Sequence, residues 1–372
     1  MPGSGPSVTR RPSVLDVGAL RAVEQVLSDI VERQTRTLAG VGPELDELVD
    51  VVRDLMDGGK RLRAAFCLWG AQAVGEDARP AGAGVAQAAA ALEMFHLGAL
   101  VHDDVMDRSE LRRGVPTVHR TFATRHTLDD RAGSAEAFGD SVAILVGDLC
   151  LTWADDLLDR AVRSATAAGH AASGEAARLV WERMRTQTMA GQYLDLVAQG
   201  RRGTSTSDAT QVLHFKSAKY TVEHPLLLGG ALVGAPAALL DDYAAFGLQV
   251  GEAFQLRDDV LGVFGDPGAT GKSSLDDVRE GKRTMLVAYA EEAAGETQLA
   301  VLRRHLGDDG LDDHGLRVVR EVLTDTGALA RVESRIGELV AQAFELLDRM
   351  PVTPESREAL VALTDASVWR SA

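Results

Sequence analysis

Residues 81–107 read AGAGVAQAAAALEMFHLGALVHDDVMD, and this stretch decides the fold because it joins the most apolar part of the chain to a group of aspartates. Gln87, Glu93 and His96 interrupt the apolar part. A helix that spans a membrane should not carry such groups in its middle. We therefore expect a helix that is buried in a protein core and ends in carboxylates.

Helical periodicity continues on both sides of this stretch. Apolar residues recur at three- and four-residue spacing, separated by glycine-rich or polar turns, over residues 14–37, 44–55, 62–74, 86–107, 141–163, 174–198, 213–230, 241–263 and 276–293, and in shorter segments to about residue 370. No long alternating run of β-branched residues appears. The pattern predicts an all-α fold in one domain over residues 14–372, after a disordered lead at residues 1–13. Residues 127–139 are polar and small, which predicts a mobile surface insertion.

Composition limits the possible functions. The chain has 372 residues, of which 45% are hydrophobic and 25% charged, as in a globular protein with a core. A formal net charge of −16 argues against general nucleic-acid binding, which needs a basic surface. Cys67 and Cys150 lie in apolar runs, which predicts buried, reduced thiols. The N-terminal residues lack an apolar signal segment, so we expect a cytoplasmic protein without stable membrane insertion.

The aspartates at the end of the apolar stretch predict a metal site. Asp103 and Asp107 are four residues apart, so they share one helix face and repel each other. Mg²⁺ with oxygen ligands relieves that repulsion. The alternative is a solvated helix end, although carboxylates at a helix C-terminus also oppose the helix dipole.

A second acidic segment has the same character. Residues 254–259 read FQLRDD, late in an apolar helix, and Lys272 and the pair Lys282 and Arg283 follow. Two acidic helix ends about 150 residues apart suggest two walls of one cavity. Basic residues near both walls indicate that the cavity holds a metal-bound polyanion, because Mg²⁺ commonly binds through one or two carboxylates together with substrate phosphates.

Two basic segments supply candidate anion sites. Residues 58–63 read GGKRLR and open a predicted helix, with Lys60 and Arg63 on one face and free N–H groups at the helix start. A basic helix start is also common on ordinary surfaces. Arg112 and Arg113 point in different directions, so each can hold a separate phosphate through a bidentate contact.

Taken together, these motifs resemble the trans-polyprenyl diphosphate synthase family, and most closely its bacterial geranylgeranyl-type members. The similarity covers about residues 45–290. It is carried by GGKRLR at 58–63, His96, DDVMD at 103–107, RRG at 112–114, Lys216-Ser217, FQLRDD at 254–259 and GDPGATGKSSLDDVREGKR at 265–283. The order and spacing of the motifs make the combination specific, although each motif alone is weak.

The resemblance implies antiparallel helices around a deep central cavity, usually in a homodimer, and a role for each matched residue. Three Mg²⁺ ions are expected on an allylic diphosphate at Asp103, Asp107 and Asp258, supported by Asp104 and Asp259. The allylic diphosphate is expected to contact Arg112, Lys216, Gln255, Lys272 and Lys282, with Gln192 and Asp195 in support. Isopentenyl diphosphate is expected at Lys60, Arg63, His96 and Arg113. Gln255 and the backbone around Lys216 and Ser217 are expected to face the developing carbocation.

Two positions depart from the family pattern. The last residue of the second acidic motif is usually Asp, and here it is Gly262, which leaves fewer acidic groups on that wall. The residue after Lys216 is often Thr, and Ser217 keeps the hydroxyl. Neither departure predicts an inactive homologue.

Product length is expected to depend on the helix that carries the first motif. Gly98 and Ala99, five and four residues before Asp103, are small, and bulky aromatics there stop growth at fifteen carbons in the resembling family. Phe95 and Leu92, further back, are large enough to form a floor. The prediction is mainly geranylgeranyl diphosphate, with a farnesyl or a longer-chain product as the alternatives.

Other functions fit the sequence less well. Gly271-Lys272-Ser273 looks like the end of a nucleotide-binding loop, but Asp266 stands where that motif needs its first Gly. A terpene cyclase shares the helical cavity but does not consume isopentenyl diphosphate, so it has no use for Lys60, Arg63 and His96. A non-catalytic subunit should have lost its metal-binding aspartates, which are present here.

Overall fold

The computed structural model describes residues 18–74, 82–201, 203–265 and 274–369. The helices are α1 Gly18–Ala39, η1 Pro43–Leu45, α2 Asp46–Met56, α3 Leu62–Gln72, α4 Gly82–Met106, α5 Val118–Leu128, α6 Ala135–Ala167, α7 Ala171–Gln199, α8 Thr206–Val212, η3 Leu213–Glu223, α9 His224–Leu232, α10 Ala237–Phe264, α12 Asp276–Arg279, α13 Met285–Ala293, α14 Glu296–His305, α15 Asp313–Asp325, α16 Ala328–Arg349 and α17 Pro354–Val368. The strands are β1 Leu111–Arg112 and β2 Val115–Pro116. The prediction of an all-α fold is confirmed.

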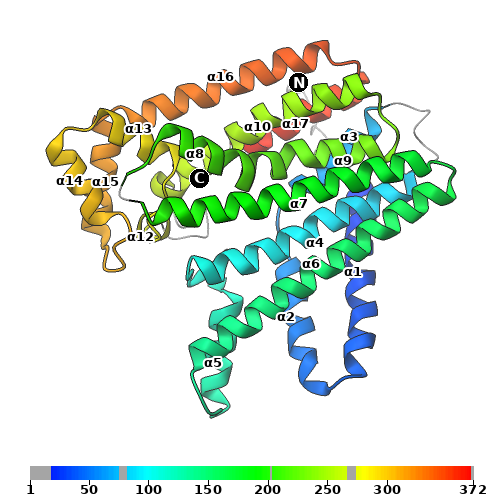
Figure 1. Ribbon diagram of the computed structural model, residues 1–372, viewed down its shortest axis with the longest axis horizontal. Helices are drawn as coiled ribbons and strands as arrows, with labels where there is room; N and C mark the ends of the chain where they lie inside the picture. Colours follow the sequence, from blue (N-terminus) through cyan, green and yellow to red (C-terminus); the bar gives the residue numbers. More distant parts are fainter. Residues whose placement is uncertain (1–17, 75–81, 202, 266–273, 370–372) are drawn as a thin grey trace, which may run out of the picture.

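Helix α4 is the centre of one half of the molecule. It packs against α6 along most of its length and also contacts α1, α3 and α9, and α4, α6 and α7 cross the middle of Figure 1 together. Ala88, Ala89, Ala90 and Ala91 are completely buried, so the helix is covered on all sides. Small side chains let neighbouring helices approach closely, which explains why alanine replaces larger apolar residues here.

Helix α10 has the same role in the other half. It packs against η3 and α16 and contacts α9, α13 and α17, and α16 lies along the upper edge of Figure 1. Gly247 and Gly251 of α10 face η3 so closely that a Cβ at Gly247 would lie 2.5 Å from Glu223 Cα. The glycines therefore hold η3 against α10.

One predicted helix changes type and another is broken. Residues 213–230 are helical throughout, as predicted, but they form the π-helix η3 and then α9, and Pro225 at the start of α9 has no N–H to donate to the preceding turn. Residues 276–293 form the separate helices α12 and α13, because Gly281 adopts φ 70° and Thr284 caps a new helix through Val287 N. This break places Lys282 outside any helix.

The predicted surface insertion at residues 127–139 is wrong. Residues 118–128 form α5, and residues 135–139 begin α6, where the Ser134 side chain accepts a hydrogen bond from Ala137 N. Gly139 packs so tightly against α5 that a Cβ there would lie 3.0 Å from Ala123 N. Only the turn between the two helices is free of regular structure.

A short hairpin that periodicity did not predict follows α4. Strands β1 and β2 pair antiparallel, with Arg112 opposite Val115. The two residues between them, Arg113 and Gly114, have φ of 53° and 79°, as a two-residue hairpin turn requires. The turn separates Arg112 from Arg113 in direction, which confirms that the two arginines point different ways.

Among the residues that the structure describes, two helices are long and apolar enough to cross a membrane by length and composition, namely residues 84–106 and α6. The most apolar window of the first is 72% buried inside the protein and that of α6 is 39% buried. The apolar stretch ending at Asp103 is therefore a core helix, as predicted. Cys67 and Cys150 are buried free thiols, and burial raises the pKa of both.

Candidate functional site

A cavity of about 900 Å³ lies between α3, α4, α7, η3, α10 and the segment from α12 to α13. Most residues that the sequence proposed for a site line it: Lys60, Arg63, Phe95, His96, Ala99, Asp103, Arg112, Arg113, Lys216, Ser217, Gln255, Asp258, Asp259 and Lys282. Leu92, Gly98, Asp104 and Asp107 are not among the lining residues. Lys272 lies outside the described residues.

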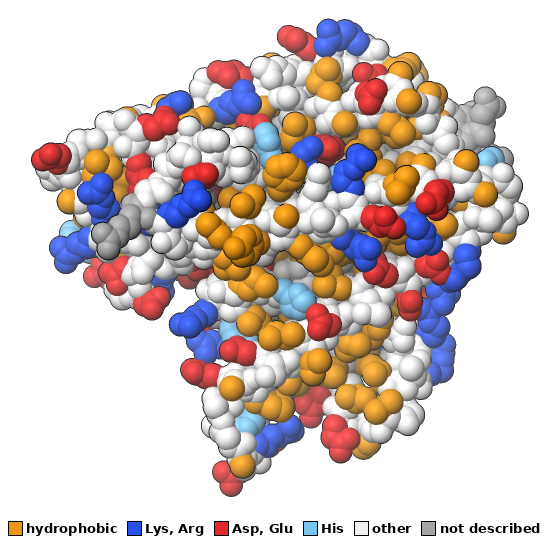
Figure 2. Space-filling model, in the orientation of Figure 1, with side chains coloured by type: hydrophobic (Ala, Val, Ile, Leu, Met, Phe, Trp, Pro, Cys, Tyr) orange, Lys and Arg blue, Asp and Glu red, His pale blue; other side chains and the backbone are white. Residues whose placement is uncertain are grey.

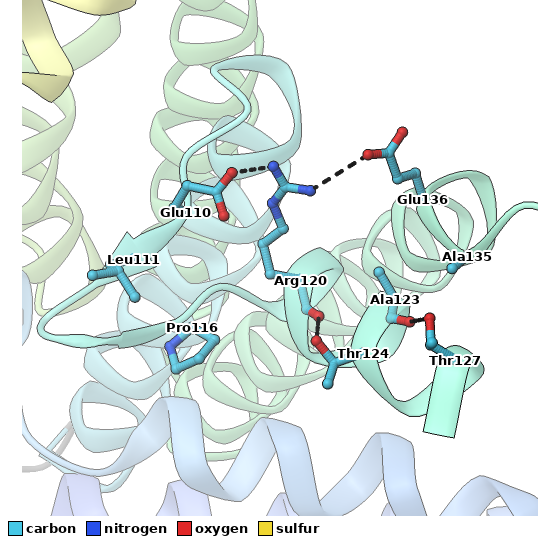
Figure 3. A pocket seen from close by; sticks show the side chains of 9 residues that line it. All are labelled: Glu110, Leu111, Pro116, Arg120, Ala123, Thr124, Thr127, Ala135 and Glu136. Carbon is cyan, nitrogen blue, oxygen red and sulfur yellow. Dashed lines mark hydrogen bonds and ion pairs between the residues drawn. The ribbon is translucent and has the colours of Figure 1, made fainter. Parts of the chain in front are cut away.

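A second, shallower recess of about 420 Å³ lies between the hairpin, α5 and the start of α6 (Figure 3). Arg120 crosses it and pairs with Glu110 and with Glu136, at 3.9 Å for Glu136. None of the proposed site residues lines this recess. Its charged groups neutralise one another, so it offers no clear binding chemistry.

Asp103 is the centre of the first acidic wall, at the end of α4. Its Oδ1 accepts hydrogen bonds from Gln192 Nε2 and from Lys216 Nζ, each at 3.0 Å. Lys216 Nζ also donates to Asp195 Oδ2 at 2.7 Å. Burial alone raises the pKa of Asp103, but Lys216, Lys282 and Arg112 together hold it well below its usual range. Asp103 is therefore a stable anion, and Gln192 and Asp195, which the resemblance placed in support of the diphosphate site, lie next to it and to Lys216.

The other two aspartates of this motif are placed differently. Asp107 has a side chain only 1% exposed, and neither of its oxygens has a hydrogen-bond partner in the described part of the chain. Burial, followed by the nearby Asp103, raises the pKa of Asp107. Asp104 turns away from the cavity, and Arg112 holds it through Nε at 2.8 Å and Nη2 at 2.5 Å. Asp104 thus fits a supporting role and positions Arg112.

The second acidic wall lies late in α10. Asp258 and Asp259 both line the cavity, and Asp259 Oδ1 accepts a hydrogen bond from Gln255 Nε2 at 2.8 Å. Burial raises the pKa of Asp259 to about 8, and the neighbouring carboxylates of Asp277 and Asp258 add to that rise. The wall therefore holds several carboxyl groups close together, of which Asp259 is buried.

Lys282 connects the two walls. Its Nζ lies 3.5 Å from Asp107 Oδ2, 2.9 Å from Asp277 Oδ1 and 2.5 Å from Glu280 Oε2. Asp277 and Glu280 were not among the residues proposed from the sequence. The sequence did contain a hint of them, because both residues lie just before Lys282 in the quoted stretch 265–283. The direction of their side chains, however, depends on the unpredicted break between α12 and α13.

The donor set fits Mg²⁺. No three His, Cys, Asp or Glu side chains converge on one point among the described residues, so the walls do not form a complete protein cage. Lysine ammonium groups stand between the carboxylates instead, and the oxygens of Asp107 lack hydrogen-bond partners among the residues that the structure places. Mg²⁺ suits such walls because it takes one or two carboxylates and completes its shell with substrate phosphates and water.

The basic end of the cavity lies at the start of α3. The helix begins at Leu62, so Lys60 lies before it. The prediction that Lys60 and Arg63 share a helix face is therefore wrong. Gly59 has φ 88°, and a Cβ there would lie 3.1 Å from Arg113 Nη2, so glycine leaves room for that guanidinium. Lys60, Arg63 and Arg113 still line the cavity together.

Glu93 binds one of the backbone N–H groups at the start of α3 that were expected to be free for an anion. Its buried carboxylate accepts a hydrogen bond from Ala64 N, in the first turn of α3, at 2.9 Å. Arg61, the residue before α3, lies 3.8 Å from the same carboxylate and pairs with Glu24 of α1 at 2.7 Å. Glu93 therefore fixes the start of α3 and with it the direction of the neighbouring cations.

The side chain of Tyr220 in η3 contacts both His96 and Arg63. Its hydroxyl lies 2.7 Å from His96 Nδ1, and the Arg63 guanidinium lies 4.2 Å from the centre of its ring. Arg63 Nη2 also donates to Thr221 Oγ1 at 3.0 Å. Burial, followed by Arg63 and other arginines, holds the pKa of His96 well below its usual range. His96 is thus a neutral donor, and sequence patterns gave no sign of Tyr220.

Lys216 and Ser217 lie in η3, whose wide turns set their position. Gly191 of α7 packs against this helix, where a Cβ would overlap Lys216 N and lie 2.7 Å from Lys216 Cα. On the other side Gly251 of α10 packs against Ala218, with 2.9 Å between a Cβ there and Ala218 Cα. The two glycines allow close packing on both sides of η3. This packing fixes the position of η3 and with it the Lys216 ammonium group beside Asp103.

The residues proposed to set product length separate into two groups. Ala99 and Phe95 line the cavity. Leu92 is completely buried away from it, and Gly98 faces α6, where a Cβ would lie 2.9 Å from Gly147 O. Of the two small residues, Ala99 therefore faces the cavity, whereas Gly98 permits close packing of two helices.

An all-helical protein with two acidic walls and a basic pocket around one deep cavity belongs to the class of helical enzymes that act on diphosphates. The model of the polyprenyl synthetase family matches residues 45–323, so the chain belongs to this family and is a prenyl diphosphate synthase.

Named relatives agree on the family and differ in product. A geranylfarnesyl diphosphate synthase of Aeropyrum pernix is 33% identical over 84% of this chain and 91% of its own length. A nonaprenyl diphosphate synthase of Mycobacterium tuberculosis is 31% identical over 84% of this chain and 83% of its own length. The crystal structure of a geranylgeranyl pyrophosphate synthase from Corynebacterium glutamicum, in complex with isoprenyl diphosphate and magnesium, has a TM-score of 0.87 and 35% identity, covering 94% of this chain and 98% of that one.

Proposed function

We propose that this enzyme joins isopentenyl diphosphate to an allylic diphosphate in a Mg²⁺-dependent reaction and makes mainly geranylgeranyl diphosphate. The observation that carries this proposal is the single cavity in which two acidic walls face a separate basic pocket. The acidic walls suit the diphosphate that is the leaving group of the reaction, and the basic pocket suits the second diphosphate, which remains in the product. A diphosphate-binding enzyme with one substrate has no need for both.

The chain's own residues account for binding and orientation. Arg112, Lys216 and Lys282 hold the allylic diphosphate, while Lys60 and the neutral His96 hold isopentenyl diphosphate. Bound Mg²⁺ supplies Lewis-acid neutralisation of the leaving diphosphate.

The chemical step needs no protein base. The allylic C–O bond breaks and the diphosphate keeps the electron pair, while the backbone around Lys216 and Ser217 and the amide of Gln255 face the resulting cation. The double bond of isopentenyl diphosphate forms the new C–C bond, and the departing diphosphate accepts the proton that is lost. The apolar walls keep water away from the cation.

Product length is proposed from the wall beside Ala99. Ala99 leaves room next to α4, while Phe95 is only 2% exposed and packs edge-on against Trp181 and Tyr220, with ring centres 5.7 Å apart in both pairs. A rigid aromatic group one turn deeper suits a floor for a twenty-carbon tail. A farnesyl or a longer product is the alternative outcome.

The test is an incubation of isopentenyl diphosphate with dimethylallyl, geranyl or farnesyl diphosphate, followed by mass analysis of the product. We expect chain extension to twenty carbons, no turnover in EDTA and recovery with Mg²⁺. Asp103→Ala should reduce kcat about a thousandfold or more, because it removes charge stabilisation of the transition state. Full activity in chelator, or Asp103→Ala within tenfold of wild type, would contradict the mechanism.

We also propose a homodimer formed through the face of α6 and α7. Figure 2 shows hydrophobic side chains gathered over α7, α4 and α6. The exposed large apolar residues of α6 and α7 include Ile144, Leu145, Met189, Tyr193 and Leu196. Residues 189, 193 and 196 follow helical spacing, so they form one stripe on α7. A stripe of this kind beside the cavity suits a second copy of the chain.

Light scattering after gel filtration tests the dimer. The wild type should have twice the chain mass, and Tyr193→Asp should have a smaller mass at the same concentration. Leu128→Asp is the matched control, because Leu128 is 79% exposed at the end of α5, outside this face. A monomeric wild type, or equal masses for all three proteins, would refute the proposed interface.

A further inference from the structure

The carboxylate of Asp277 stands on the face of α10 where residue 262 has no side chain. Residues 258 and 262 are one helical turn apart, so they share the face that looks into the cavity. A Cβ on Gly262 would lie 2.9 Å from Asp277 Cγ and would overlap Asp277 Oδ2. Asp277 comes from α12, yet its oxygen occupies the place next to Asp258 along α10.

Asp277 also faces the first acidic wall. Asp277, Gly262 and Asp258 all line the cavity. Lys282 Nζ lies 2.9 Å from Asp277 Oδ1 and 3.5 Å from Asp107 Oδ2, so one ammonium group separates the carboxylates of the two walls. Asp277 is therefore within reach of anything that bridges α4 and α10.

Three carboxylates share the Lys282 ammonium group. Its Nζ lies 3.5 Å from Asp107 Oδ2 and closer still to Asp277 Oδ1 and Glu280 Oε2. The buried Asp107 lacks a hydrogen bond to either of its oxygens within the described ranges, which is costly for a carboxylate. A divalent ion on oxygen ligands satisfies such a site, and it frees the Lys282 ammonium for a phosphate oxygen.

We propose that Asp277 is a metal-binding residue of the second acidic wall, and that it supplies an oxygen to the Mg²⁺ ion held by Asp258. In this enzyme the third carboxylate of that wall comes from α12, because α10 carries glycine at position 262. The proposal rests on the Mg²⁺-dependent function given above.

The experiment exchanges the carboxylate between the two positions and measures metal binding directly. Mn²⁺ binding in the presence of inorganic pyrophosphate is followed by electron paramagnetic resonance for the wild type, Asp277→Ala, Gly262→Asp, the double variant and Asp258→Ala. Asp276→Ala is the matched control, since it removes the same charge one residue away and Asp276 does not line the cavity.

We expect Asp277→Ala to weaken pyrophosphate-dependent Mn²⁺ binding about 10- to 100-fold. Gly262→Asp alone should also weaken it, because the new side chain overlaps Asp277. The double variant should recover to within about threefold of wild type, which is under 1 kcal/mol, and Asp276→Ala should change binding less than about twofold. Circular dichroism shows whether each variant remains folded.

The outcomes separate the two proposals. If the wild type binds no Mn²⁺ with pyrophosphate, the proposed Mg²⁺-dependent function is wrong. If the wild type binds, Asp258→Ala loses binding and Asp277→Ala keeps it, only the role of Asp277 is overturned. A folded double variant that stays as weak as Asp277→Ala also overturns it, because the carboxylate would then not be exchangeable between the two positions.

Discussion

Tyr220 illustrates how much of the site is decided by single side chains that lie outside the recognisable sequence motifs. Its hydroxyl lies 2.7 Å from His96 Nδ1. If the hydroxyl donates to Nδ1, the proton of the neutral ring lies on Nε2, the nitrogen that remains available for a diphosphate. The same ring holds the Arg63 guanidinium, so Tyr220 positions two predicted ligands of isopentenyl diphosphate.

Tyr220→Phe should therefore raise KM for isopentenyl diphosphate about tenfold, as expected for one lost hydrogen bond to a binding group. KM for the allylic primer should change less than about threefold. Steady-state kinetics with each substrate varied in turn measures both values. Tyr243→Phe is the control, because this buried tyrosine donates to Gly70 O at 2.9 Å and lies outside the cavity lining. Equal shifts for both substrates would contradict the positioning role.

Sequence motifs located the charged residues of the site but only some of their partners. Asp103, Lys216 and Arg112 stand in recognisable strings, so a resemblance assigns them directly. Tyr220 appears in the sequence as an ordinary helical residue and Glu93 only as a polar interruption of an apolar stretch, and the contacts of both depend on the face that they turn to the cavity. Asp277 was quoted without a role, because its contact with Gly262 depends on tertiary packing between α10 and α12.

At the scale of elements, the π-helix η3 positions the reacting groups. Gly191 on α7 allows η3 to come so close that an added methyl group would overlap Lys216 N. Gly191→Ala should therefore move η3 away from α7 and shift the Lys216 ammonium from Asp103. A displacement of about 1 Å in a positioned group costs about a hundredfold in rate.

Measured kcat/KM for the allylic primer should fall by that factor in Gly191→Ala, while the circular dichroism spectrum remains helical. Gly337→Ala is the matched control, because nothing lies within 4 Å of a Cβ at this position of α16. Alanine there should stabilise the helix by about 0.5–1 kcal/mol and leave kinetics unchanged. Wild-type kinetics in Gly191→Ala would show that η3 is not held by this contact.

Helix α4 gives a second test at this scale, because Ala99 and Gly98 face different partners. Ala99→Phe should shorten the product to fifteen carbons or fewer, since the ring fills space beside the tail. Phe95→Ala should lengthen it. Gly98→Ala should instead lower the melting temperature without changing product length, because its methyl group would lie 2.9 Å from Gly147 O.

Mass analysis of the products and thermal unfolding of the three variants separate these effects. A shorter product from Gly98→Ala, with no change from Ala99→Phe, would show that the tail runs along the other side of α4.

Periodicity predicted where the long helices run, since α4, α6, α7 and α10 bury one face or all faces in a regular pattern. It failed where one residue changes the backbone. Gly281 follows the end of a helix that the apolar pattern would continue, and Arg113-Gly114 closes a hairpin that is too short to show alternation. These breaks place Lys282 and Arg112 in the cavity, so the unpredictable part of the fold is also the part that builds the site.

At the scale of the whole molecule, the cavity is formed where the half built on α4 meets the half built on α10. The sequence predicted two acidic walls because both helices end in aspartates. It did not reveal how close the walls come, which depends on η3 and on the small residues of α7 and α10. The joint between η3 and α9 also contains a buried histidine, His224, which makes the stability of the whole fold sensitive to pH.

His224 is 1% exposed, and its Nε2 lies 3.0 Å from Gln187 Oε1 on α7. Burial, followed by Lys219 and Arg183, lowers the pKa of His224 to about 3 from its ordinary value of 6.5. The native state therefore favours the neutral ring. Its contribution to stability is fully present above pH 6.5 and is lost as the pH falls toward 3, because the unfolded chain takes up the proton first.

Between pH 6.5 and 4.5 this effect should remove about 2–3 kcal/mol from the free energy of unfolding, at about 1.4 kcal/mol for each pH unit. His224→Gln keeps an amide that can pair with Gln187 and cannot ionise, so its stability should fall less over the same range. Urea titrations at pH 7 and pH 4.5 measure the difference. His314→Gln is the control, since His314 is an exposed histidine on α15 and should leave the acid-induced loss as in wild type. If His224→Gln loses as much stability as wild type between the two pH values, the acid sensitivity of the fold arises elsewhere.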